Sequence, residues 1–306
     1  MAPLFDILGF GCVAVDDLLY VESYPPADAK APVLRRERQC GGLVGTALVT
    51  AARLGAKCLY VATLGQDDLS AFVLERLRRE KIDVSRVARK AQAGPVHSVI
   101  VVGQDNGSRN IFPDARGVTA ARVPRLKAAL VRASRLLFID HFWIEQKLPA
   151  VRIARKAGIP VVADFEDIRD PQFPELLHLV DHLVLSAEIA RQITGAEPAR
   201  AVEKLWSKQR QVVAVTGGAD GCWFRAGAAA GHVPAFRVKA VDTTGCGDVF
   251  HGAYAAGLTR GMGVEERLRF AAAAAAIKAT RPGGQQGIPT RPQLERFLKG
   301  PLKTHL

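Results

Sequence analysis

Short apolar runs of strand length alternate with longer segments of helical periodicity through most of the chain. Such an alternation predicts a mainly parallel sheet that is covered by helices on both faces, which is an α/β fold. The predicted strands are residues 4–15, 57–64, 136–140, 161–164, 182–185, 212–215 and 222–224. The predicted helices are residues 47–54, 71–81, 147–157, 250–258 and 265–280.

Two early stretches, 18–38 and 97–113, do not follow this alternation. Residues 97–102 alternate between apolar and polar positions and lead into Asn106-Gly107, a dipeptide that favours a tight turn, so we expect a hairpin that reaches Ile111-Phe112. The pattern predicts a single domain over residues 1–306. It carries a small β-sheet lid, built from insertions at about 17–40 and 96–114.

Composition narrows the class of protein. The 306 residues are 48% hydrophobic, which is enough for a large core, and the net charge is +12. The basic residues are spread along helical stretches beside acidic ones, as in residues 74–81, which indicates solvated helix faces and no nucleic-acid surface. No apolar run has the length of a membrane span. The five cysteines include no Cys-x-x-Cys pair, so we expect neither disulfides nor zinc and a cytoplasmic location.

The segment Asp242-Thr-Thr-Gly-Cys-Gly-Asp248 carries the strongest chemical signal. Gly245 and Gly247 let the backbone turn sharply and point several N–H groups at one spot, just before a helix expected to begin near Val249. Such a turn is suited to a phosphate that gains charge during transfer, and Asp248 beside it can take a proton from a hydroxyl. An isolated Gly-x-Gly-Asp would be explained as an acidic helix cap, whereas the complete string is more specific.

These seven residues resemble the C-terminal signature of the ribokinase/PfkB family of carbohydrate kinases. Three further landmarks follow the family order: 41–55 with 65–68, then 213–221, and last 278–284 with 287–289. Within the family, residues 242–254 and 270–289 are most similar to sulfofructose kinase, and ketohexokinases are a looser match. The resemblance implies an ATP-dependent phosphotransferase that acts on an alcohol group of a sugar, with a ketohexose-like substrate favoured.

The resemblance also implies site residues. Asp248 would be the catalytic base, and the backbone of Gly245, Cys246 and Gly247 would form the anion hole. Asp16, Lys30, Gly42, Thr46 and Arg109 would face the sugar. ATP, with Mg²⁺ bridging its phosphates, would lie along Ser186, Thr216, Gly218, Gly221, Lys278 and Gly284. Asp242 and Thr243 would help to bind a structural potassium ion, and the lid would join two subunits into a homodimer.

Three positions depart from the family pattern. Thr46 stands where the first signature often has Asn, and it offers a hydroxyl in place of an amide. The common Asn-x-x-Glu element is replaced by Ser186-Ala-Glu188-Ile189, so its magnesium-linked carboxylate is displaced or lost. Phe142 stands where sulfofructose kinase uses an Arg. A phenyl ring cannot replace a bidentate cation, although Lys30 could match the other sulfonate-contacting cation.

Other functions remain open at this point. A nucleoside kinase of the same superfamily would use the same base, and the irregular Ser186 segment also fits a catalytically silent protein that binds sugar or nucleotide. Residues 9–14 match a relaxed dinucleotide-binding fingerprint, but that motif needs a helix directly after it, and Asp16-Asp17 and Pro25-Pro26 follow instead. No Gly-x-x-x-x-Gly-Lys-Ser/Thr string occurs, which excludes a P-loop enzyme.

Overall fold

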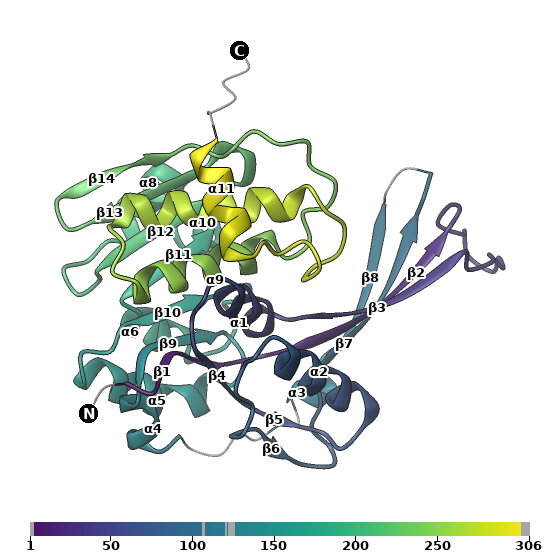
Figure 1. The fold of residues 1–306 in the computed structure, drawn as a ribbon, viewed down its shortest axis with the longest axis horizontal. Helices are drawn as coiled ribbons and strands as arrows, with labels where there is room; N and C mark the ends of the chain where they lie inside the picture. Colours follow the sequence, from purple (N-terminus) through teal and green to yellow (C-terminus); the bar gives the residue numbers. More distant parts are fainter. Residues whose placement is uncertain (1–2, 106–107, 120, 122–125, 301–306) are drawn as a thin grey trace.

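The computed structural model describes residues 3–105, 108–119, 121 and 126–300. The strands of its main sheet are β1 (Phe5–Phe10), β4 (Cys58–Val61), β9 (Ser134–Asp140), β10 (Val161–Asp164), β11 (His182–Ser186), β12 (Val212–Thr216), β13 (Cys222–Ala226) and β14 (Ala229–Val233). Within the described residues they lie in the order β14-β13-β12-β11-β10-β9-β1-β4 (Figure 1). The strands from β12 to β4 pair in parallel, and β13 and β14 add an antiparallel edge.

Successive strand residues point to opposite sides of this sheet, so both of its faces carry apolar side chains, and helices cover both. Leu136 and Phe138 pack toward one helical layer, and Leu137 and Ile139 pack toward the other. The first layer contains α1 (Leu43–Arg53), α2 (Asp68–Arg79), α9 (Cys246–Thr259), α10 (Val264–Ala279) and α11 (Arg291–Lys299). The second contains α4 (Ala128–Arg132), α5 (Ile144–Lys156), α6 (Phe173–Leu179), α7 (Ala187–Thr194) and α8 (Pro198–Leu205).

A second sheet of four strands projects from the main body (Figure 1). Its strands are β2 (Ala14–Val21), β3 (Arg35–Gly41), β7 (Val96–Gly103) and β8 (Arg109–Asp114), in the order β3-β2-β7-β8. The pairing of β7 with β8 confirms the predicted hairpin, and its predicted turn at Asn106-Gly107 lies outside the described residues. The short elements β5 (Thr63–Leu64), β6 (Ala88–Arg89), α3 (Arg116–Thr119) and the 3₁₀ turn η1 (Gly218–Asp220) complete the described fold.

The predicted fold class is therefore confirmed, but several boundaries were wrong, and two of them bear on the site. Residues 4–15 were predicted as one strand, whereas the chain leaves the main sheet after Phe10 and enters the small sheet at Ala14. At that crossing Cys12 donates its backbone N–H to Asp140 Oδ2 at 2.6 Å. Helix α9 begins at Cys246, three residues earlier than expected, so Asp248 lies in its first turn. None of the helices described is both long and apolar enough to cross a lipid bilayer.

Candidate active site

Polar residues collect at the carboxyl edge of the main sheet. Neighbouring strands β9 to β12 end at Asp140, Asp164, Ser186 and Thr216, and the register pairs Asp164 with Asp140 and Thr216 with Ser186. Parallel strands bring their carboxyl ends to one edge, which is where α/β proteins bind ligands. The N-terminal end of α9 packs across this edge, because His251 lies 3.2 Å from Asp164 Oδ2 and 3.0 Å from the carbonyl oxygen of Val184.

The predicted anion hole lies at the start of α9. Gly245 is the N-cap and has φ of 73°, a left-handed conformation that glycine adopts without strain. A Cβ on Gly245 would lie 3.7 Å from both Gly284 Cα and Thr46 Cγ2, so the turn brings together three predicted site residues. Gly247 is exposed, and a Cβ there would meet no heavy atom within 4 Å. The exposed Gly247 can therefore present its amide to an anion, and the helix dipole favours one there, whereas the Cys246 amide already donates to the carbonyl oxygen of Thr243.

Asp248 lies beside these amides in the first turn of α9. Burial raises the pKa of its carboxyl group well above the ordinary value, and the negative charges of Asp164 and Glu166 raise it further. The nearby charge of His251 acts in the opposite direction. Among the described residues no lysine or arginine forms an ion pair with Asp248. A carboxylate that is held at a helix start without a cationic partner is a good proton acceptor for a hydroxyl.

Asp164, Glu166 and His251 belong to the same cluster, and the sequence reasoning missed their role. Asp164 is only 5% exposed, and the pKa of its carboxyl group is raised mainly by burial and then by Glu166. His251 Nδ1 also lies 2.8 Å from the carbonyl oxygen of Gly247, so this ring links the strand edge to the anion-hole turn. The available signal was the position of Asp164, which ends the predicted strand 161–164.

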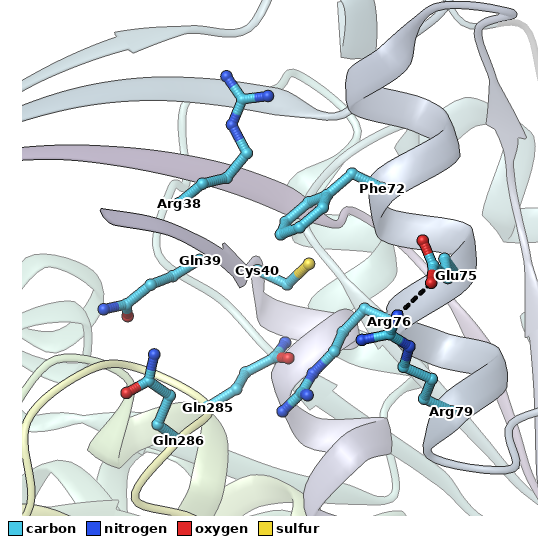
Figure 2. A pocket seen from close by; sticks show the side chains of 9 residues that line it. All are labelled: Arg38, Gln39, Cys40, Phe72, Glu75, Arg76, Arg79, Gln285 and Gln286. Atoms are coloured by element: carbon cyan, nitrogen blue, oxygen red, sulfur yellow. Dashed lines mark hydrogen bonds and ion pairs between the residues drawn. The ribbon is translucent and has the colours of Figure 1, made fainter. Parts of the chain in front are cut away.

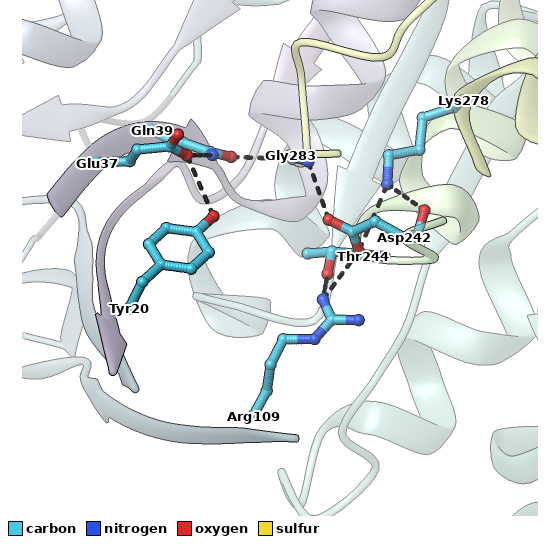
Figure 3. Close-up of polar contacts among 9 residues, drawn as sticks. Tyr20, Glu37, Gln39, Arg109, Asp242, Thr244, Lys278 and Gly283 are labelled. Atoms are coloured by element: carbon cyan, nitrogen blue, oxygen red, sulfur yellow. Dashed lines mark hydrogen bonds and ion pairs between the residues drawn. The ribbon is translucent and has the colours of Figure 1, made fainter. Parts of the chain in front are cut away.

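Asp242, at the start of the motif, is surrounded by donors (Figure 3). Arg109 donates to its Oδ1 at 2.8 Å, the Thr244 amide donates to the same oxygen at 2.9 Å, and the Gly283 amide donates to Oδ2 at 2.9 Å. Burial alone would raise the pKa of this carboxyl group. The Thr244 and Gly283 donors and the charge of Lys278 outweigh burial and lower the pKa to about 2.

Lys278 was predicted to contact the nucleotide, and this prediction was wrong. Its side chain is 0% exposed, and its ammonium group donates to the carbonyl oxygen of Asp242 at 2.7 Å. Thr243, the other predicted potassium ligand, is exposed and uses its carbonyl oxygen to accept the Cys246 amide at 3.1 Å. The Asp242 carbonyl and both carboxylate oxygens thus already have protein donors, so the residues do not fit a potassium ion at Asp242.

The predicted sugar-binding residues are only partly brought together. Asp16 is partly buried and hydrogen-bonded to Ser98, and burial raises its pKa. It lies over the start of α1, since a Cβ on Gly41 would be 2.8 Å from Asp16 Oδ2. Gly42 has φ of 86°, and a Cβ there would come within 2.5 Å of Val13 Cα, so a side chain is excluded by the crossing backbone.

Two other predicted sugar contacts do not fit their places in the structure. Thr46 is 1% exposed, and its hydroxyl oxygen lies 3.4 Å from Gln285 Nε2, so it supports the loop and does not face the substrate. Lys30 is exposed in the loop between β2 and β3, at the distal end of the small sheet (Figure 1). Arg109 reaches Asp242 and Thr244 instead of standing free for a sugar.

A cavity of about 730 Å³ opens beside the strand ends of β11 and β12. Ser186 and Thr216, both predicted to lie along ATP, line it together with Glu188 and Trp223. One wall is formed by Asp220 of the turn η1 and by Gly217, which directly precedes that turn. The predicted residues Gly218 and Gly221 shape that turn with φ of 59° and 92°. Gly284, also predicted on the nucleotide, instead donates its amide to Gln39 Oε1 at 3.1 Å.

A smaller cavity of about 220 Å³ lies between β3, α2 and the loop at Gln285 and Gln286 (Figure 2). Three arginines line it, but each forms an ion pair with a carboxylate: Arg38 with Asp17, Arg76 with Glu80 and Arg79 with Glu75. Its positive charge is therefore compensated. The larger cavity, which opens at the carboxyl ends of β11 and β12, is the better candidate for the ligand.

Comparison with known proteins agrees with this geometry. The model of the pfkB family of carbohydrate kinases matches residues 9–291, and the chain belongs to that family. It is 29% identical to a ribokinase from Haemophilus influenzae over 273 residues, which cover 85% of this chain and 87% of the relative. It is 26% identical to fructokinase-1 from Oryza sativa subsp. japonica over 319 residues, 96% and 97% of the two chains.

The fold also matches solved structures. The ribokinase of Arabidopsis thaliana, solved in complex with ribose and ATP, superposes with a TM-score of 0.88 at 24% identity and covers 98% of this chain and 100% of that one. The family predicted from four short landmarks is thus confirmed, and with it the ribokinase-like arrangement of a large and a small sheet.

Proposed function

We propose that this protein transfers the γ-phosphate of ATP to a hydroxyl group of a sugar, with Asp248 as the general base. One observation carries the proposal: the Asp248 carboxylate, which pairs with no lysine or arginine among the described residues, stands in the first turn of α9, beside the exposed Gly247. Membership of a carbohydrate-kinase family supports the same reaction. Ribokinase and fructokinase, the names of the relatives, are both sugar kinases.

In the proposed reaction the substrate hydroxyl gives its proton to the Asp248 carboxylate. The freed oxygen forms a bond to the γ-phosphorus, and the bond from that phosphorus to the β-phosphate oxygen breaks to release ADP. The amides at the start of α9 and the dipole of the helix stabilise the negative charge on the transferred group. No covalent enzyme intermediate is needed, because the acceptor oxygen attacks directly.

The 730 Å³ cavity has a suitable size for the nucleotide, since ligand pockets usually enclose about 300–1,000 Å³. Its position beside Ser186 and Thr216 puts phosphates close to the strand edge. Mg²⁺ fits this edge, because it is commonly bound by one or two carboxylates together with substrate phosphates. Asp164 and Glu166 would hold it there, and the ion would neutralise charge on the phosphates. Asp164 Oδ2 is buried and accepts no hydrogen bond within the described residues.

The small sheet is proposed to act as a lid over the sugar. Arg109 on β8 contacts Asp242 and Thr244 in the catalytic turn, which joins the two parts of the molecule in a closed arrangement (Figure 3). Closure excludes water that would otherwise compete with the sugar for the γ-phosphate. Asp16 on β2 is the remaining candidate to bind a sugar hydroxyl from the lid side.

A coupled ADP-release screen distinguishes a sugar kinase from a nucleoside kinase and from a catalytically silent binding protein. The panel contains ketohexoses, aldoses, sugar acids, sulfofructose and nucleosides. We expect turnover with a ketohexose-like sugar. Turnover confined to nucleosides would establish a nucleoside kinase, and ATP binding without any turnover would establish a silent nucleotide-binding protein. Either of the last two results would overturn the proposal.

We also propose that the lid joins two copies of the chain. Ile111 and Phe112 are adjacent on the edge strand β8, so they point to opposite faces of the small sheet, yet they are 57% and 53% exposed. Exposed apolar side chains on an edge strand favour a partner that covers them. Sedimentation velocity at micromolar concentration should show a dimer, and Phe112→Lys should shift it to monomer. A wild-type chain that sediments only as monomer would contradict this.

A further inference from the structure

Lys278 is unusual because a lysine ammonium group lies completely inside the protein. It is the penultimate residue of α10, and its side chain is 0% exposed. Burying an ammonium ion costs several kcal/mol unless oxygen atoms replace its water. Those oxygens come from Asp242: the carbonyl oxygen at 2.7 Å and carboxylate Oδ1 at 3.9 Å. In Figure 3 the ammonium and Arg109 approach Asp242 from different sides.

The position of this ammonium is fixed by the backbone. Val241 and Asp242 both donate their amides to the carbonyl oxygen of Ala279, at 2.7 and 3.1 Å, so the end of α10 is bonded to the start of the catalytic motif. Gly287 packs on Lys278 from the other side, since a Cβ there would lie 3.0 Å from the Lys278 carbonyl oxygen and 3.4 Å from its Cγ. The charge therefore cannot move away from the turn without disrupting α10 or the 283–287 loop.

Carbonyl and carboxylate oxygens around a buried point are the usual ligands of hard metal cations. A protonated lysine has the same unit charge as a potassium or sodium ion and three donors to direct at oxygens. Its charge acts on the candidate site, because Lys278 interacts electrostatically with Cys246 and Asp248. The Asp242 turn thus contains a positive charge that is covalently attached to the chain.

We propose that the ammonium group of Lys278 replaces a monovalent metal ion at the Asp242 turn, so that this protein needs no potassium. The inference deepens the proposed kinase function and rests on it for the activity measurements alone. The structural part concerns the protein without substrates, so it can be tested even if the reaction has been assigned wrongly.

The test compares wild-type protein in KCl, NaCl and choline chloride at equal ionic strength. We expect the same thermal unfolding temperature in all three salts, and turnover of the best sugar that agrees within about twofold, because no site for K⁺ remains to be filled. A saturable rise of the unfolding temperature that is specific to K⁺ would overturn the inference. A requirement of turnover for K⁺ would overturn it as well.

Two variants of Lys278 test whether its ammonium group occupies the place of an ion. Lys278→Ala leaves space and oxygen ligands for an ion, whereas Lys278→Met fills the space with an apolar chain. In choline chloride both variants should lose about tenfold or more in turnover, as when an electrostatic group is removed from a site. KCl should raise the unfolding temperature of Lys278→Ala by about 3 °C or more and restore part of its turnover, with no effect on Lys278→Met. A Lys278→Met protein that matches wild type in both measurements would contradict the proposal.

Discussion

The Asp248→Asn variant should lose about 10²–10⁴-fold in turnover while the fold and sugar binding are retained, which is the usual contribution of a general base. Asparagine has nearly the same shape as aspartate, but its amide cannot accept the hydroxyl proton at neutral pH. Initial rates of ADP release with the best sugar measure the loss, and calorimetric titration measures sugar binding. Asp170→Asn, at an exposed position, is the matched control and should keep full activity. An Asp248→Asn enzyme with wild-type turnover would rule out this base.

The pH profile of the same enzyme provides an independent check. A base must be deprotonated to act, and burial together with Asp164 and Glu166 raises the pKa of Asp248. Activity should therefore be lost on acidification at a higher pH than expected for an ordinary aspartate, whose pKa is about 3.9. Asp164→Asn removes one of the repelling charges, so the acid limb of kcat/KM should move to lower pH. An acid limb that does not move would exclude this coupling.

The parts of the site that follow from local sequence could be predicted. The motif 242–248 defines a glycine turn, a helix start and an acidic residue beside it, and all three are present around Gly245 and Asp248. The strand end at Asp164 follows equally from a short apolar run, and β12 ends at Thr216, one residue beyond the predicted strand 212–215. The carboxyl edge of the sheet is then determined by parallel pairing, which alternating strands and helices already indicate.

Contacts between distant segments could not be predicted in this way. Thr46 was expected to face the sugar, yet its hydroxyl group meets Gln285, 239 residues away in the chain. Lys278 was assigned to the nucleotide because it precedes the glycine-rich tail, but helix α10 directs it to Asp242. Motif matching assigns a residue to a neighbourhood in sequence. The direction of its side chain depends on how α1, α9 and α10 pack together. A local sequence pattern carries no information about that packing.

Asp140 is a buried charge that links several segments next to the candidate site. Its carboxylate forms an ion pair with Lys147 in which both side chains are 0% exposed, and it also accepts the amides of Cys12 at 2.6 Å and Phe142 at 3.0 Å. Lys147 donates in addition to the Asp140 carbonyl oxygen at 2.9 Å. The pair thus joins α5 to the end of β9 and to the crossing at Cys12, where the chain enters the small sheet.

Removing this lysine should therefore have the largest effect on stability. Lys147→Met should lower the free energy of unfolding by about 3–5 kcal/mol, because it leaves the Asp140 carboxylate buried without its cation. Chemical denaturation of the purified chain measures the loss. Arg79→Met is the matched control: its partner Glu75 is 60% exposed, and breaking such an exposed pair should cost about 0–1 kcal/mol.

The double variant Lys147→Met with Asp140→Asn distinguishes an unpaired charge from a simple packing defect. If the uncompensated carboxylate causes the loss, the double variant should recover part of the stability, because the amide that replaces the carboxylate has no charge to bury and its oxygen can still accept the Cys12 amide. If the loss of unfolding free energy in the double variant equals the sum of the losses in the two single variants, the packing around Lys147, and not its charge, holds α5 against the crossing. The same crossing starts β2, which carries Asp16, so the stability lost at Lys147 should be accompanied by weaker sugar binding.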